Sequence, residues 1–129
     1  MSLNFQIKRE SAFILVAGDG EFDLADSKRI IETAIDSALE QKVPRILIDA
    51  RSVTGKPTTM QRFEFANHVV TLYRQRERAR FIRIAVVGFK PLIDPNRFGE
   101  TVAVNRGVPL RVTTNITEAI EWLAAKGAE

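Results

Sequence analysis

The sequence predicts an α/β fold with a mixed, mainly parallel five-stranded sheet, an N-terminal antiparallel hairpin and four helices. Short aliphatic runs alternate along the chain with segments whose apolar residues recur at helical spacing, which is typical of a parallel sheet with crossover helices. The first two strand-like segments are separated by only a short connection, which favours a hairpin. No linker or repeat divides the 129 residues, so we expect a single domain over residues 1–129.

Five segments have the pattern of strands. The first and the last alternate apolar and polar residues, whereas the three between them are continuous aliphatic runs typical of buried strands. In chain order, the predicted strands are residues 5–8, 12–17, 45–50, 81–88 and 110–113.

Four further segments are expected to be helices, because each combines a capping residue with an apolar face. The third ends before Gly107, which suits a left-handed C-terminal cap, and the fourth has Glu118 three residues after its first residue, as in a capping box. The predicted first residues or caps are Asp23 or Asp26, Thr58 or Thr59, Pro95, and Asn115.

The composition excludes several classes of enzyme. The chain has no cysteine and one histidine, His68, so thiolate metal sites are excluded and a Ser-His-Asp hydrolase would depend on that one residue. The net charge is +3, and the basic excess is concentrated in an arginine cluster. At helical spacing these arginines spread around a helix end and form no single basic face, so nucleic acid is not expected as a partner. The arginine cluster consists of Arg74, Arg76, Arg78, Arg80 and Arg83.

The N-terminal segment lacks the pattern of a signal peptide, and no apolar run approaches the ~20 residues of a membrane-spanning helix. We therefore expect a cytoplasmic protein with no transmembrane segment.

Residues 55–58 are similar to the end of a phosphate-binding loop, but Ala50 stands where that loop needs glycine. The sequence predicts no cofactor.

Charged side chains follow the predicted strands at their carboxyl ends, where ligands of parallel sheets usually bind. Asp49, Arg51, Lys56 and Asp94 are therefore candidate binding residues. If Asp19 and Asp94 converged on Asp49, their oxygens could hold Mg²⁺. The alternative is that each aspartate only orders its own loop, and on this interpretation no metal is expected.

The predicted second helix has more apolar residues than one inward stripe can bury. Phe65, Val69 and Leu72 are offset from its main face. Such a surplus indicates a subunit interface or an apolar ligand pocket. We expect a homodimer that forms through these three residues, with a small apolar ligand as the alternative.

The order of the elements, with residues 46–54 (Ile-Leu-Ile-Asp-Ala-Arg-Ser-Val-Thr) leading into a helix, resembles the STAS domain superfamily, which includes bacterial anti-sigma-factor antagonists. The Asn105-Arg106-Gly107 turn and residues 118–123 look most like the uncharacterised STAS/Sec14-like stand-alone bacterial proteins. The resemblance implies a STAS-like fold and a non-enzymatic regulatory module with a protein partner.

The antagonists carry an Asp-Ser-Ser-Gly motif after this strand, and a partner kinase phosphorylates its first serine. The resemblance places Thr58 at that serine and makes Thr58 or Thr59 the possible phospho-acceptor, although Pro57 and Met60 depart from the motif. The other interpretation is that one threonine caps the helix, which stabilises a protein by about 1 kcal/mol.

Together, these observations predict a regulatory or protein-interaction module that is not an enzyme. A module that binds a small apolar or anionic ligand is the alternative. An Asp49-centred metal-dependent hydrolase is third, because no base, nucleophile or complete motif accompanies Asp49.

Overall fold

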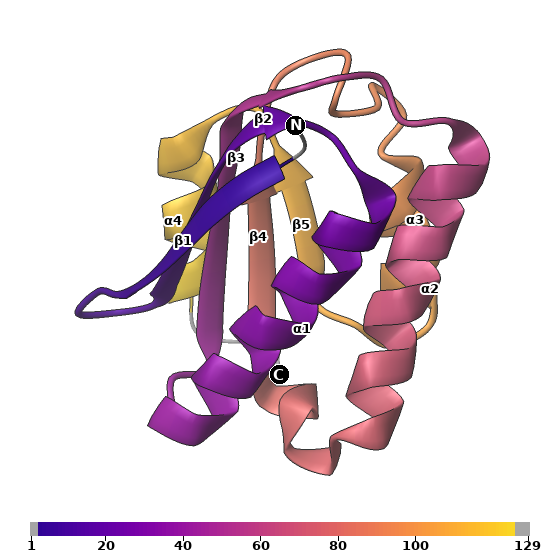
Figure 1. Cartoon of the computed structure of the whole chain (residues 1–129). Coiled ribbons are helices and arrows are strands. Elements are labelled where there is room, and N and C mark those ends of the chain that lie inside the picture. Colours follow the sequence, from indigo (N-terminus) through magenta and orange to yellow (C-terminus); the bar gives the residue numbers. More distant parts are fainter. Residues whose placement is uncertain (1–2, 126–129) are drawn as a thin grey trace.

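The computed structural model describes residues 3–125 and has the predicted α/β architecture (Figure 1). The sheet has the spatial order β1-β2-β3-β4-β5, with β1 antiparallel to β2 and the other neighbours parallel. The predicted fold class is therefore confirmed. The strands are β1 (Leu3–Arg9), β2 (Ile14–Glu21), β3 (Arg45–Thr54), β4 (Arg83–Val87) and β5 (Leu110–Thr113).

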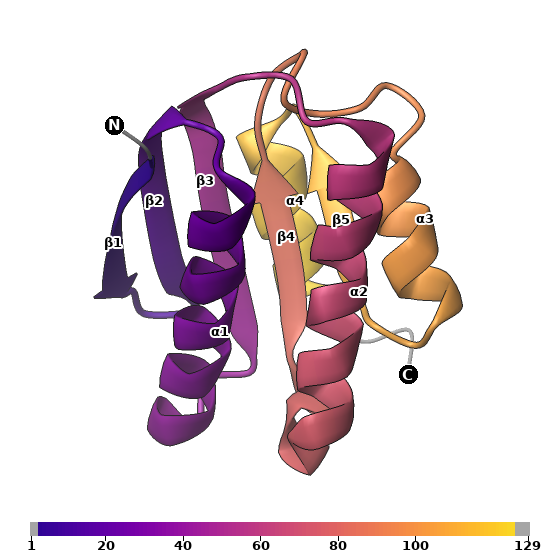
Figure 2. The ribbon, with the colours of Figure 1, turned by 45° about the vertical axis from the view of Figure 1, so that its right-hand side comes forward.

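The helices form a layer on each face of the sheet (Figures 1 and 2). Three helices cover one face, and α4 packs on β3, β4 and β5 at the other. A short 3₁₀ helix, η1, joins α2 to β4, and no helix within residues 3–125 is long and apolar enough to cross a membrane. The helices are α1 (Leu24–Gln41), α2 (Thr59–Gln75), η1 (Glu77–Phe81), α3 (Phe98–Asn105) and α4 (Ile116–Ala124).

Side-chain caps begin the helices largely as predicted. The carboxylate of Asp23 accepts the backbone N–H of Asp26 at 2.8 Å, and Asn115 caps α4 in the same way. The prediction for the third helix is wrong at its start: α3 begins at Phe98, not at Pro95. The preceding residue, Arg97, has a left-handed backbone (φ 52°), which ends the loop with a turn that a right-handed helix cannot contain.

Strands β2 and β3 extend further than predicted. The pair shifts register between Ala17 and Asp19, and this bulge lets both strands continue past Gly18 instead of turning there. Strand β3 pairs with β4 only as far as Asp49, and its last residues, up to Thr54, pair with β2 alone. Arg51, which follows the predicted strand 45–50, therefore lies within β3 together with Asp49 and not in a loop.

Alternate strand residues build two separate cores. Ile14, Ile46 and Ile84 are buried beneath α1 and α2, whereas Leu47 and Val87 are buried beneath α4. The further members of the α4 core are Ala85, Ala119 and Leu123. Because these strands are buried on both faces, their sequences are continuous aliphatic runs.

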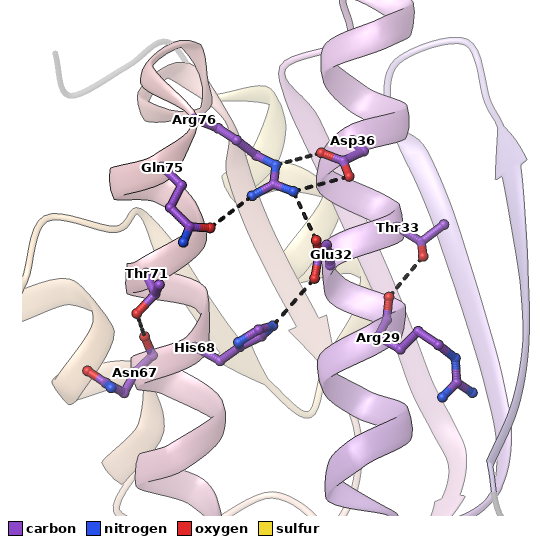
Figure 3. A network of polar contacts seen from close by, with 9 residues as sticks. All are labelled: Arg29, Glu32, Thr33, Asp36, Asn67, His68, Thr71, Gln75 and Arg76. Atoms are coloured by element: carbon purple, nitrogen blue, oxygen red, sulfur yellow. Dashed lines mark hydrogen bonds and ion pairs between the residues drawn. The ribbon is translucent and has the colours of Figure 1, made fainter.

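Two members of the arginine cluster hold elements together. The guanidinium of Arg76, at the end of α2, binds Asp36 and Glu32 of α1 (Figure 3). Arg83 donates to the carbonyls of Trp122 and Ala125 at the end of α4, where cations are favoured. Two of the five arginines of the cluster, Arg76 and Arg83, are therefore engaged in structural contacts.

Candidate functional site

The carboxyl end of the sheet brings together most of the predicted site residues. Asp49 and Arg51 form a two-pronged ion pair, with Arg51 Nε 2.9 Å from Asp49 Oδ1 and Nη2 2.8 Å from Oδ2. The hydrogen bonds from the Arg51 guanidinium lower the pKa of the Asp49 carboxyl, which stays ionised and paired. The two charges largely satisfy one another, so this pair is a poor docking point for a free anion or cation.

Thr58 is the N-cap of α2. Its hydroxyl accepts the Gln61 backbone N–H at 3.0 Å, and the Gln61 side chain accepts the Thr58 backbone N–H at 2.9 Å. This reciprocal pair is a complete capping box, so the capping interpretation is confirmed. Thr58, Thr59 and Lys56 are all exposed at the start of the helix.

The three aspartates of the hydrolase alternative do not form a metal site. Asp19 and Asp49 line a polar depression of about 330 Å³ on β1, β2 and β3. Asp94 instead lies in the β4–α3 loop, where it accepts the Phe98 backbone N–H at 2.9 Å, and this hydrogen bond lowers its pKa. Within residues 3–125, no three His, Cys, Asp or Glu side chains are grouped so that they could hold a metal ion.

The interface predicted on α2 is wrong for two of its three residues. Val69 and Leu72 are fully buried inside the chain, because α2 packs over the sheet and has α1 and α3 on its flanks. Phe65 is half-buried and lines an apolar cavity. The homodimer stays a prediction, and Val69 and Leu72 cannot form its surface.

An apolar cavity of about 180 Å³ lies between the sheet and the first halves of α1 and α2. Ile48, Val86 and Phe65 face it and are only half-buried, although β3 and β4 are inner strands of the sheet. Charged and polar residues also reach the cavity, mostly from the start of α2 and the β4–α3 loop. Six apolar residues that define its walls are Val16, Ile30, Ile48, Phe65, Val86 and Val112.

The β4–α3 loop, residues 88–97, covers the carboxyl end of the cavity through Leu92 and Ile93. Arg62 of α2 holds this loop by donating to the carbonyls of Leu92 at 2.6 Å and Pro91 at 3.0 Å. A guanidinium bound to two carbonyls fixes the loop against the first turns of α2.

Two large apolar side chains are exposed at the same end of the molecule. Met60, in the first turn of α2, is 64% exposed, and Phe89, in the β4–α3 loop, is 51% exposed. Their elements are the two that Arg62 ties together. We call the exposed residues Lys56, Met60, Phe89 and Lys90 the carboxyl-end surface.

The surplus of apolar residues on α2 predicted an apolar pocket only as the alternative to an interface, and of its three residues Phe65 alone lines the cavity. One available signal was the small size of Gly18, Ala50 and Ala66, which line it at positions where larger residues would fill the space. Small residues also occur in well-packed cores, so they do not by themselves indicate a cavity. They do so only when the positions of α1 and α2 are known.

Comparisons with known proteins agree with this architecture. The family model described as SpoIIAA-like matches residues 13–124. The fold is similar to the crystal structure of an anti-sigma factor antagonist from Mycobacterium paratuberculosis, with a TM-score of 0.59, 17% identity and 96% of each chain covered. It is also similar to an uncharacterised protein with a SpoIIAA-like fold from Shewanella loihica, with a TM-score of 0.54, 17% identity and 95% and 94% of the chains covered.

No curated protein matches the sequence. Identities of 17% to the solved structures establish a shared fold and nothing about activity. The family match, in contrast, spans the sheet from β2 to β5 together with all four helices. The chain thus belongs to the SpoIIAA-like family.

Proposed function

We propose that this chain is a non-enzymatic regulatory module of the cytoplasm that binds a partner protein through its carboxyl-end surface. The exposure of Met60 and Phe89, on the two elements that Arg62 ties together, carries the proposal. Large apolar side chains in contact with water favour association, and they commonly form the centre of a protein interface.

The geometry around these two residues supports a docking role. Arg62 fixes the β4–α3 loop to α2, so both side chains are presented from elements that are held together. A surface ordered before binding loses less conformational entropy when the partner docks. Lys56 and Lys90 add positive charge to this surface, which favours a partner with apolar residues and acidic groups around them.

The comparisons support a regulatory role without defining the partner. One similar structure is that of an anti-sigma factor antagonist, a protein named for its action against another protein. We infer that this chain shares that general mode of action. Its partner differs, because residues 57–60, which join the β3–α2 loop to α2, depart from the motif of the antagonists at Pro57 and Met60.

We also propose phosphorylation of Thr58 or Thr59 as the regulatory event. Both threonines are exposed at the start of α2, where the helix dipole favours a phosphate. A phosphate there would add negative charge beside Met60 and would weaken the docking of an acidic partner.

Affinity capture with the full chain tests the docking surface. The wild type, a Met60→Ser/Phe89→Ser variant and a Phe81→Ser control are each used to isolate partners from cells of the source organism. Phe81 is 64% exposed, as Met60 is, but lies in η1 before β4 at the opposite end of the sheet. We expect a partner that the control retains and the double variant loses. A partner that both variants retain, or both lose, would contradict the proposal.

A further inference from the structure

We propose that the cavity between the sheet and α1–α2 binds one compact, uncharged apolar molecule or apolar group. This inference goes beyond the docking function, because it concerns the interior of the chain and not its surface. The cavity, at about 180 Å³, is somewhat larger than the roughly 150 Å³ apolar cavity that accepts benzene. A substituted benzene ring or a short aliphatic chain is therefore of suitable size.

Strands β3 and β4 show where the close packing of the core beneath α1 and α2 ends. On the face covered by α1 and α2, Ile46 and Ile84 are fully buried near the amino ends of β3 and β4. Two residues further along the same strands and on the same face, Ile48 and Val86 are only half-buried. The interior on this side is thus complete at one end of the sheet and open at the other.

On the opposite face of these strands, the aliphatic residues beneath α4 are fully packed. Leu47 is 1% exposed, and Ala85 and Val87 are 0% exposed beneath α4. The open space is consequently confined to one side of the sheet and is not a general looseness of the core. An apolar guest would supply the dispersion contacts that the half-buried side chains lack.

Four of the five charged residues that line the cavity are already engaged, and the fifth, Arg97, is exposed at the start of α3. Arg62 donates to two loop carbonyls, Asp94 accepts the Phe98 N–H, and Asp49 is paired with Arg51. Glu100, which also reaches the cavity, accepts the Val112 N–H at 2.6 Å. A charged group placed among the apolar walls of the cavity would have to displace these bonds or remain unpaired there, so an uncharged ligand is favoured.

The polar contacts between α1 and α2 define the route of access. Arg76 binds Asp36 and Glu32, and His68 Nε2 lies 4.0 Å from Glu32 Oε1 (Figure 3). These contacts close the second half of the groove between the two helices. The cavity lies beside their first halves, so the ligand enters beside these first halves and not between the second halves.

Methyl NMR of the purified full chain tests the proposal with three defined probes. Toluene and 1-hexanol are uncharged, whereas hexanoate has the same chain length as 1-hexanol and carries a negative charge. We expect toluene and 1-hexanol to cause saturable shifts of the Ile48 and Val86 methyl signals, with little effect on Leu47 and Val87 across the sheet. We expect hexanoate to bind at least ten-fold more weakly than 1-hexanol.

Other outcomes overturn the proposal. Shifts of equal size on both faces of the sheet would mean non-specific association. No saturable shift up to the solubility limit of the uncharged probes would mean no binding site. Hexanoate binding as strongly as 1-hexanol would contradict the uncharged class of ligand.

A blocked cavity provides the matched comparison. Val86→Phe extends a side chain into the space, and we expect it to abolish the probe-induced shifts at Ile48 while the Leu47 signals remain those of the folded chain. Phe81→Ser, on the exposed η1 segment, should leave probe binding unchanged. If Val86→Phe does not fold, Ile48→Phe tests the same point from β3. Full probe binding by a folded, blocked variant would show that the probe binds elsewhere.

Discussion

Arg76 at the end of α2 holds Asp36 of α1 through two hydrogen bonds, Nε to Oδ1 at 2.6 Å and Nη2 to Oδ2 at 3.3 Å. The same Nη2 is 3.0 Å from Glu32 Oε2 (Figure 3). The Arg76 side chain is only 22% exposed, so its bonds are less screened than those of a typical surface pair. These contacts join two helices whose partner residues are 40 positions apart in the sequence.

Arg76→Ala should therefore lower the free energy of unfolding by about 1 kcal/mol, the upper end of the range for partly exposed pairs. Arg76→Lys should recover only part of the loss, because an ammonium cannot bind both oxygens in the same planar arrangement. Urea denaturation measures both effects. Arg74→Ala is the control, since Arg74 is exposed and should have almost no effect. Equal losses for Arg74 and Arg76 would refute a specific role of the ion pair.

Thr58→Ala should destabilise the chain by about 1 kcal/mol, because it removes the acceptor for the Gln61 N–H at the start of α2. Thr59→Ala, one residue later, should change the stability little, since Thr59 is exposed and alanine is a good helix former. Urea midpoints of the two variants give the comparison. A larger loss for Thr59 than for Thr58 would mean that the cap is assigned to the wrong threonine.

Tyr73 should make the stability fall at high pH. Its buried hydroxyl donates to the Ile82 carbonyl at 2.6 Å, and burial raises its pKa above the ordinary value of 10.0. The folded state thus holds the proton more tightly than the unfolded state does. The stability this group contributes is fully present below the ordinary pKa and is lost as the pH rises above it.

Tyr73→Phe isolates this effect. At neutral pH the variant should be less stable by about 1 kcal/mol, because the Ile82 carbonyl loses its buried donor. The difference from the wild type should shrink as the pH increases from about 9 to about 11, since only the wild type has a phenol to deprotonate on unfolding. Thermal or urea unfolding across this range measures the difference. A constant difference would show that Tyr73 does not titrate as its burial requires.

The fold was predictable because its signals are local. Asp23, Thr58 and Asn115 each cap a helix through a residue three positions later, and such pairs are visible in the sequence. The second strand was predicted to end at residue 17, before Gly18, because glycine is as typical of a turn as of the bulge that it forms here. Whether a strand continues past a glycine depends on its neighbour, here β3.

The candidate site was less predictable because it depends on distant neighbours. Val69 and Leu72 read as surplus apolar residues until α1 and α3 are placed beside α2 and bury them. The Arg76–Asp36 pair joins residues that no short-range pattern relates. The cavity exists because no other side chain packs fully against Ile48 and Val86. A sequence pattern shows only that these two residues are apolar, and not that space is left beside them.

Val86→Phe and Val87→Phe should change the stability in opposite directions, although they are neighbours and receive the same side chain. Val86 faces the cavity, so the added ring gains contacts and should stabilise the chain by about 1 kcal/mol, as cavity-filling substitutions commonly do. Val87 is 0% exposed beneath α4, where overpacking should cost about 1–3 kcal/mol. Urea denaturation of both variants decides the matter. If Val86→Phe were destabilising to the same extent as Val87→Phe, the space beside Val86 would be too small to receive a ring, and a ligand of that size could not bind there either.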